Sequence, residues 1–328
     1  MKKIITIAKY TVSMIIIGII GLVSYVRYVL PDVGNPEKIS IESTAERIAR
    51  GKYLANSVCV CMDCHSTRDW NKFSGPLVAG TLGKGGEKFD QKFGFPGIYY
   101  AKNITPFALK DWTDGEILRA ITSGVNKNGK ALFPVMPHPS YGKLDRDDLF
   151  SIIAYLRSLD PVENLVPESV SDFPMNFIIN LIPKKAGFSH IPDENDRVAY
   201  GSYLFTAAAC NDCHTQQIKG EQVARLELAG GFKFPLLNGG VVRSANITPD
   251  KETGIGNWAE EDFVNRFKEF ADSTYLPEEI QKGEFNTVMP WTMYGTMKED
   301  DLKAIFAYLR TVKPIKNKVK RFTAKESE

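Results

Sequence analysis

Two five-residue stretches decide how this chain folds: Cys61-Met62-Asp63-Cys64-His65 and Cys210-Asn211-Asp212-Cys213-His214. Both follow the pattern Cys-x-x-Cys-His, and they contain four of the five cysteines in the 328 residues. With only 4 histidines in the chain, two chance occurrences of this pattern have a probability on the order of 10⁻⁶. The two stretches therefore indicate two copies of one chemical site.

Cys-x-x-Cys-His is the attachment signature of c-type haem. The two sulfurs form thioether bonds to the vinyl groups of one porphyrin, and the adjacent histidine then lies beneath the iron. The motifs predict two covalently bound haem c groups. The attachment residues and proximal ligands would be Cys61, Cys64 and His65 for the first haem, and Cys210, Cys213 and His214 for the second.

The sequence around the motifs is also repeated. Each copy contains, in the same order, Gly-x-Tyr-Leu, the haem motif, Asn-Ile-Thr-Pro, a tryptophan, Val-Met-Pro and Ala-Tyr-Leu-Arg. Residues 135–162 and 288–315 align without a gap, and half of the 28 positions are identical. The repeat predicts two duplicated domains, 43–162 and 193–315, joined by a connector over 163–192.

The repeat also provides a candidate for the sixth iron ligand of each haem. Met136 and Met289 lie in the two Val-Met-Pro loops, at the same distance before the two Ala-Tyr-Leu-Arg segments. A methionine is more often core filler, but matched positions in two haem-bearing copies favour His/Met ligation, an arrangement known for cytochromes c. The competing residues are not repeated in the other copy. Met293 corresponds to Ser140, Met297 to Leu144, and His138 to Trp291.

Helical signals open and close each copy. Capping boxes at 43–46 and 113–116 predict helix starts, and apolar residues recur at helical spacing over 149–156 and 302–309. Gly-, Pro- and Asn-rich loops, such as 83–97 and 126–129, lie between them. Because strand patterns are weak, we expect a mainly α fold.

The N-terminus predicts a transmembrane helix. Residues 10–30 are almost entirely apolar and would span roughly 30 Å as a helix, the thickness of a bilayer core. Lys2, Lys3 and Lys9 precede the span, so the positive-inside rule places residues 1–9 in the cytoplasm. A linker over 31–42 and both haem domains would then be periplasmic. The alternative is a cleaved signal peptide, but no small-residue cleavage site follows the long apolar run.

The remaining features allow two readings each. The apolar stretch 173–182 either packs across both domains or forms a docking surface. The basic tail, 316–328 with Lys325 near its end, is typical of a solvated, mobile terminus, with lipid or partner binding as the alternative.

Cys59 is expected to be a small buried residue beside the haem rather than an intermolecular link, and His190 reads as structural. The Asn-Ile-Thr-Pro loops, Trp112 and Trp258 are expected to line the haem pockets.

Each copy resembles a class I cytochrome c domain, with a haem motif after the first helix, a methionine in a late loop and a closing helix. The Gly-x-Tyr-Leu, Asn-Ile-Thr-Pro and Met-Pro elements are similar to those of the multihaem cytochrome c subunits of periplasmic alcohol, aldehyde and gluconate dehydrogenases. Those subunits usually carry three haems and often a C-terminal anchor, whereas this sequence has two motifs and an N-terminal span. The resemblance covers roughly residues 45–315.

The resemblance implies an inner-membrane electron carrier rather than an enzyme. Electrons would enter from a dehydrogenase or a quinol-oxidising complex and leave to a soluble cytochrome or a terminal oxidase. A dihaem peroxidase or a thiosulfate dehydrogenase is the enzymatic alternative, but two matched methionines disfavour an open or unusual iron site. The net charge of only +2 argues against nucleic acid as a partner.

Overall fold

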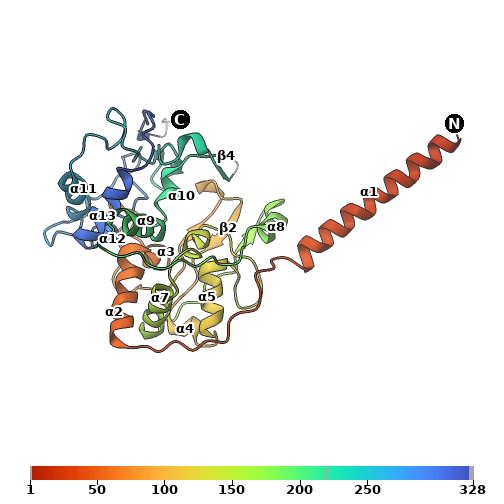
Figure 1. Cartoon of the computed structure of the whole chain (residues 1–328), viewed down its shortest axis with the longest axis horizontal. Helices are drawn as coiled ribbons and strands as arrows, with labels where there is room; N and C mark the ends of the chain where they lie inside the picture. The colour runs from red at the N-terminus through yellow and green to blue at the C-terminus, as the bar shows by residue number, and fades with distance from the viewer. Residues whose placement is uncertain (1, 219, 325–328) are drawn as a thin grey trace.

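The computed structural model describes residues 2–218 and 220–324; Lys325 of the predicted tail lies outside them. Helix α1 (Lys2–Tyr28) projects from a globular body (Figure 1). The side chains of residues 3–28 are exposed except for the half-buried Val26, and within the described residues this is the one helix long and apolar enough to cross a membrane. It ends two residues before the predicted limit of the span. The N-terminal helix is thus confirmed, and its composition fits a membrane anchor.

The body consists of two halves built around matching helix pairs (Figure 1). In the first half α2 (Ala45–Tyr53) packs on α7 (Arg146–Ser158), and in the second α9 (Arg197–Ala207) packs on α13 (Glu299–Leu309). Three shorter helices also recur in matching order: α3 (Cys61–Cys64), α5 (Asp114–Ser123) and α6 (His138–Tyr141) correspond to α10 (Cys210–His214), α11 (Glu260–Lys268) and α12 (Trp291–Tyr294). The one-turn helix α4 (Pro106–Leu109) has no helical counterpart among the described residues of the second half.

In each helix pair, a glycine on the first helix allows the two backbones to approach closely. A Cβ atom on Gly51 would lie 1.8 Å from the carbonyl oxygen of Ser151 in α7, and one on Gly201 would lie 1.9 Å from that of Ala304 in α13. The conserved spacing of Gly-x-Tyr-Leu in the two copies therefore has a packing cause. The apolar faces on either side, including Leu54 and Leu204, are almost completely buried.

Short strands add three small sheets. The first has the antiparallel order β1 (Lys88–Phe89), β2 (Gly97–Tyr100), β3 (Val170–Ser171), and β4 (Gln217–Ile218) pairs with β5 (Glu221–Gln222). In the third sheet β7 (Val241–Arg243) lies between β6 (Lys233–Pro235) and β8 (Phe322–Thr323). The prediction of a mobile tail is wrong for β8, because its backbone pairs with Val241 and Val242.

Helix starts follow the sequence signals with one shift. Thr113 and Glu116 form the predicted capping box at the start of α5. At α2 the N-cap is Thr44, whose hydroxyl accepts a hydrogen bond from the backbone N–H of Arg47. The predicted box beginning at Ser43 is therefore displaced by one residue. Either residue type can cap a helix, so composition alone does not select between neighbours.

The connector does not pack across both halves. It contains helix α8 (Met175–Ile178) and a 3₁₀ turn, η3 (Ile179–Leu181), and Phe173 is 81% exposed. η3 instead lies against the outer end of α1, where the Asn180 side-chain amide donates to the carbonyl of Val26 (3.2 Å). Burial against both halves was therefore the wrong reading of this apolar stretch.

The two halves are joined by a reciprocal contact. Tyr203 of the second half donates to Asp148 of the first (2.7 Å), and Tyr53 of the first donates to Asp301 of the second. Both tyrosines come from Gly-x-Tyr-Leu and both aspartates from the Asp-Asp-Leu start of the closing helix. Burial raises the pKa of Tyr53 and Tyr203, so both phenols stay protonated as donors. The exchange of equivalent contacts gives the interface approximate two-fold symmetry.

We expect Gly51→Ala and Gly201→Ala each to destabilise the protein by about 1–3 kcal/mol, the usual cost of overpacking a close contact. The measurement is denaturant unfolding of the purified protein. Gly187→Ala is the matched control, because a Cβ there would meet nothing within 4 Å. Equal unfolding midpoints for all three variants would show that the helix crossings tolerate a side chain.

Candidate functional site

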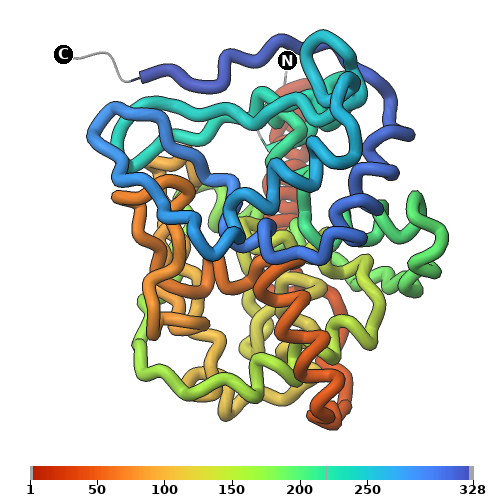
Figure 2. Tube along the Cα trace, turned by 90° about the vertical axis from the view of Figure 1, so that its left-hand side faces the viewer, coloured from red at the N-terminus to blue at the C-terminus, as the bar shows by residue number. Residues whose placement is uncertain are grey.

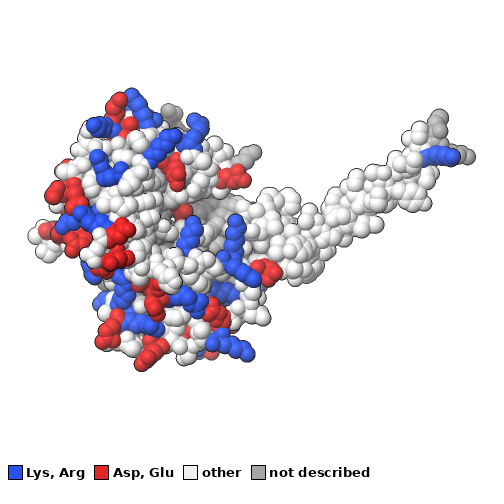
Figure 3. Space-filling model, in the orientation of Figure 1, with Lys and Arg blue, Asp and Glu red and all other residues white. Residues whose placement is uncertain are grey.

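A single cavity of about 3270 Å³ runs through both halves of the body. Its volume exceeds the roughly 300–1,000 Å³ of an ordinary small-molecule pocket. Figure 3 shows the body hollowed between the halves, on the side from which α1 leaves. All eight residues predicted from the sequence line this one cavity: Cys61, Cys64, His65, Met136, Cys210, Cys213, His214 and Met289.

Each motif helix begins at a residue with left-handed backbone. Val60 (φ 44°) precedes Cys61, and Ala209 (φ 50°) precedes Cys210. Such conformations are unfavourable for residues with a side chain and tend to persist at functional sites. In both copies the strained residue turns the chain immediately before the first cysteine of the motif. Both cysteine pairs therefore face the cavity.

Cys59 occupies the position that Ala208 holds in the second copy. Its side chain is buried and lines the cavity, and burial raises the pKa of its thiol. The carbonyls of Cys59 and Ala208 accept equivalent hydrogen bonds from the phenols of Tyr141 (2.8 Å) and Tyr294 (2.7 Å). The equivalence with alanine fits a small packing residue, as predicted.

Both motif histidines are oriented by a backbone carbonyl. His65 Nδ1 lies 2.6 Å from the oxygen of Lys102, and His214 Nδ1 lies 2.9 Å from that of Ala245. A carbonyl accepts only from a protonated nitrogen, so this contact leaves Nε2 with a free lone pair for a metal. Burial lowers the pKa of both imidazoles, which favours the neutral, ligating form.

The Asn-Ile-Thr-Pro loops hold these carbonyls in place. The Asn103 amide donates to the Val162 carbonyl and the Asn246 amide to the Ile315 carbonyl, both at 2.8 Å. Each loop is thereby attached to the segment that follows the closing helix of its own half. Trp112 and Trp258 line the cavity, and so do the first two residues of each Asn-Ile-Thr-Pro loop, as predicted. The asparagines in addition fasten the loops.

A glycine in each half also helps to hold the motif histidine beside its orienting carbonyl. The N–H of Gly85 donates to the His65 carbonyl and that of Gly230 to the His214 carbonyl, both at 2.8 Å. Both have positive φ (71° and 72°), and a Cβ on either would lie within 2.5 Å of the backbone that carries the orienting carbonyl. Only glycine fits such a position without displacement of that backbone.

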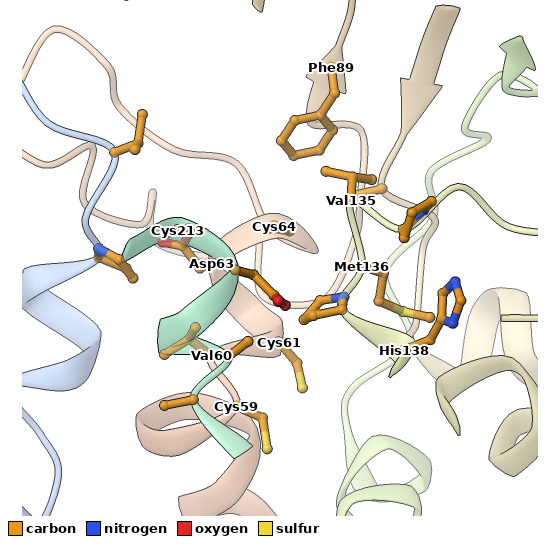
Figure 4. A pocket seen from close by; sticks show the side chains of 18 of the residues that line it. Cys59, Val60, Cys61, Asp63, Cys64, Phe89, Val135, Met136, His138 and Cys213 are labelled. Carbon is orange, nitrogen blue, oxygen red and sulfur yellow. The ribbon is translucent and has the colours of Figure 1, made fainter. Parts of the chain in front are cut away.

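The predicted methionines differ from their competitors in placement. Figure 4 shows Met136 across the cavity from Cys61 and Cys64, with His138 beside it. His138 is 1% exposed, its Nε2 is unpaired, and burial lowers its pKa to about 4. The ring lines the cavity and packs on Gly124, where a Cβ would lie 2.5–2.6 Å from three of its atoms. What separates Met136 from His138 is therefore the matching methionine in the second copy, where Trp291 stands in place of His138.

The other competitors are placed less favourably than Met289. Met293 is buried but does not line the cavity, and Met297 lines it from a nearly inaccessible core position. His190 has a fully exposed side chain and lies 3.8 Å from Asp145. It is therefore a surface residue, and its contact with Asp145 is at most a weak one.

A buried ion pair follows the first motif and has no counterpart in the second. Arg68 donates to Asp63 Oδ2 (2.8 Å) and stacks on the ring of Trp70 at 4.0 Å. Burial raises the pKa of Asp63 to about 6, although the charge of Arg68 opposes the shift. Gln217 stands in place of Arg68 in the second copy. The sequence analysis missed this pair, because Arg68 lies outside both motifs.

The residues around the cavity fit covalently bound haem. Two cysteines and a histidine with free Nε2 lie at the cavity in each half, and Met136 and Met289 line the same cavity. The four motif cysteines are accessible from the cavity: Cys61, Cys64 and Cys210 are half-buried and Cys213 is exposed. When bound, the haem iron would supply one-electron redox chemistry.

Comparison with known proteins points in the same direction. Residues 198–313 match the profile of the family described as "Cytochrome c". The chain is 27% identical over 286 residues to the cytochrome c subunit of alcohol dehydrogenase (quinone) from Komagataeibacter europaeus, covering 82% of this chain and 56% of that protein. It is 26% identical over 282 residues to the gluconate 2-dehydrogenase cytochrome c subunit of Pantoea cypripedii, with 81% and 59% covered.

A third relative is nearer in length. The chain is 28% identical over 269 residues to a diheme cytochrome c-type protein of Cereibacter sphaeroides, covering 78% of this chain and 82% of that protein. By contrast, it spans little more than half the length of the two dehydrogenase subunits. These matches support haem c and electron transfer in this chain. Residues 198–313 are a domain of the cytochrome c family, in a chain similar to the cytochrome c subunits of dehydrogenases.

Proposed function

We propose that this protein is a membrane-anchored dihaem cytochrome c that relays electrons and carries out no substrate chemistry of its own. Two class I cytochrome c domains, 43–162 and 193–315, would each hold one haem. The observation that carries the proposal is the matched pair of histidines, each held through Nδ1 by an equivalent carbonyl at one shared cavity.

In this proposal the iron of the first haem is ligated by His65 and Met136, and that of the second by His214 and Met289. A thioether ligand favours ferrous iron and occupies the sixth position. Occupied sixth positions suit electron transfer and exclude peroxide, which disfavours the peroxidase alternative. Because both motifs line one continuous cavity, the two haems would be near neighbours, and electrons could pass between them within the chain.

The proposed anchor is α1, with the body on the periplasmic side. Figure 3 shows a largely uncharged surface along this helix, with basic side chains near its N-terminal end; Arg27 is exposed in its last turn. The connector beside the outer end of α1 exposes Phe173, Ile178 and Leu181, next to Lys184 and Lys185. Apolar residues flanked by lysines at this level fit the headgroup region of an anionic bilayer.

The proposed electron donor is a dehydrogenase or a quinol-oxidising complex, and the acceptor a soluble cytochrome or a terminal oxidase. The support is the similarity to cytochrome c subunits of alcohol and gluconate dehydrogenases. Gentle detergent extraction followed by identification of co-purifying subunits tests this. A dehydrogenase or oxidase subunit is expected in the purified complex.

Covalent attachment predicts that the full-length protein, denatured and extracted with acidic solvent, retains two haems per chain. The Cys210→Ser/Cys213→Ser variant should retain one, because thioether bonds require the thiols. The measurement is haem content per polypeptide by mass spectrometry of the denatured protein. Cys59→Ala is the control and should keep both haems. Fewer than two covalent haems in the wild type would contradict the dihaem assignment.

Ligation by Met289 predicts that Met289→Ala loses about half of the weak long-wavelength absorption band that ferric haem shows with a sulfur ligand. Met293→Leu should keep the whole band, since that buried side chain does not line the cavity. Absorption spectra of both ferric variants at equal haem content make the comparison. An unchanged band in Met289→Ala would remove this residue as a ligand, and rapid peroxide turnover by the wild type would favour the enzymatic alternative.

A further inference from the structure

The segment Trp70–Gly75 follows the first haem motif and belongs to the first half in sequence, but it packs against the second half of the molecule. The N–H of Phe73 donates to the Glu278 carbonyl (2.8 Å), and Ile280 N–H donates to the Asn71 carbonyl (2.7 Å). The ring of Phe73 also stacks on Phe270, with centroids 6.1 Å apart. Figure 2 shows this orange segment directly beside the blue chain of the second half.

Ser74 is the residue of this segment that reaches the Met289 loop. Its side chain is fully buried, and its hydroxyl donates to the carbonyl of Met289 (2.5 Å) and accepts from the N–H of Trp291 (3.1 Å). Its own N–H donates to Asn286 Oδ1 (2.9 Å). One hydroxyl thus fixes the backbone on both sides of Pro290 and, with it, the start of the Met289 side chain.

Ser74 is itself held by the buried arginine. Arg68 donates to the carbonyl of Ser74 (2.6 Å) and to that of Gly75 (2.9 Å) while its third contact is Asp63. Ser74 has φ +63°, a conformation that non-glycine residues rarely adopt. These hydrogen bonds form a continuous path from the first haem motif, through Arg68 and Ser74, to the Met289 loop.

The backbone of the Met136 loop has no equivalent restraint among the described residues; the nearest contact with the second half is the Ser140 hydroxyl, which donates to Asp212 Oδ2 (3.5 Å). Both loops contain the same internal bond, His138 N–H to the Met136 carbonyl (2.7 Å) and Trp291 N–H to the Met289 carbonyl (2.9 Å). Within residues 2–218 and 220–324, however, no side chain of the second half hydrogen-bonds the backbone of 135–138. The restraint on Met289 is therefore specific to the second site.

We propose that Ser74 is a positioning residue for Met289, supplied to the second haem site by the first half of the chain. The inference rests on the proposed role of Met289 as an axial ligand. Residues that orient a ligand typically change metal affinity about 10–100-fold when they are removed. Without the Ser74 hydroxyl, the methionine sulfur should be displaced more readily by an external ligand.

The test is an imidazole titration of the ferric full-length protein in detergent, followed by loss of the long-wavelength sulfur band. A Met136→His background removes the contribution of the first haem, so the remaining band reports on the second alone. Ser74→Gly removes the hydroxyl at a position whose positive φ suits glycine. We expect the imidazole concentration at half-loss to fall about 10–100-fold.

Ser151→Ala is the matched control. It removes another buried hydroxyl of the first half, one that bonds only to the Asp147 carbonyl within α7, and should leave the titration unchanged. Unchanged behaviour of Ser74→Gly would overturn the positioning role. Failure of the proposed function appears separately, as a missing sulfur band in the wild type or an unchanged band in Met289→Ala, and it would overturn the inference as well.

A measurement on the wild type makes the inference independent of folding of the variants. By hydrogen exchange, the amide of Trp291, which is bonded to Ser74, should be protected more strongly than the amide of His138, which has only the bond within its own loop. Equal protection of the two amides would contradict a specific restraint on the second loop.

Discussion

A hydrogen bond between an imidazole Nδ1 and a backbone carbonyl is the constraint on which both sites depend. It fixes the tautomer of each motif histidine and leaves Nε2 available to a metal. Its acceptors, Lys102 and Ala245, directly precede the two Asn-Ile-Thr-Pro loops. The loops, the glycines that contact them and the segments after the closing helices all act to hold those two carbonyls in position.

The duplication shapes the interface as well as the sites. Both halves carry Gly-x-Tyr-Leu and Asp-Asp-Leu. The tyrosine of each half can therefore donate a hydrogen bond to the aspartate of the other. Within the first half, Arg50 holds Asp148 by a bidentate contact at 2.8 and 2.9 Å. Several buried, mutually paired groups restrict relative motion of the halves more than isolated surface ion pairs would. If each half holds a haem as proposed, such an interface would keep the distance between the two haems fixed.

The sequence was most informative where chemistry restricts residue choice. Cysteine and histidine spacing predicted the attachment residues, and comparison of the copies favoured Met136 and Met289 over Met293, Met297 and His138; the structure shows that all eight predicted residues line the cavity. The repeat also marked Gly51 and Gly201, although their packing role required the structure. Periodicity likewise located α7 and α13.

The misses share a physical cause: they depend on contacts between segments distant in sequence. The tail at Phe322 is ordered by pairing with β7, so its local charge was a poor guide to order. The apolar connector lies against α1 rather than between the halves. Orientation of His65 by Lys102 uses a backbone atom, which leaves no side-chain signature. Such acceptors can be found from sequence only through the loop that repeats around them.

Departures from the symmetry of the duplication separate the two sites. Arg68 and Ser74 have no matching partners in the second copy, and their contacts join the first motif to the Met289 loop. Asp63, which is paired to Arg68, lies between the two haem-binding cysteines of the first motif. One contact runs the other way: the hydroxyl of Ser140, just after the Met136 loop, donates to Asp212 of the second motif (3.5 Å). It is a single long hydrogen bond at the side chains, whereas Ser74 bonds the backbone on both sides of Pro290. The two copies of the site therefore differ in how firmly their methionine loops are held.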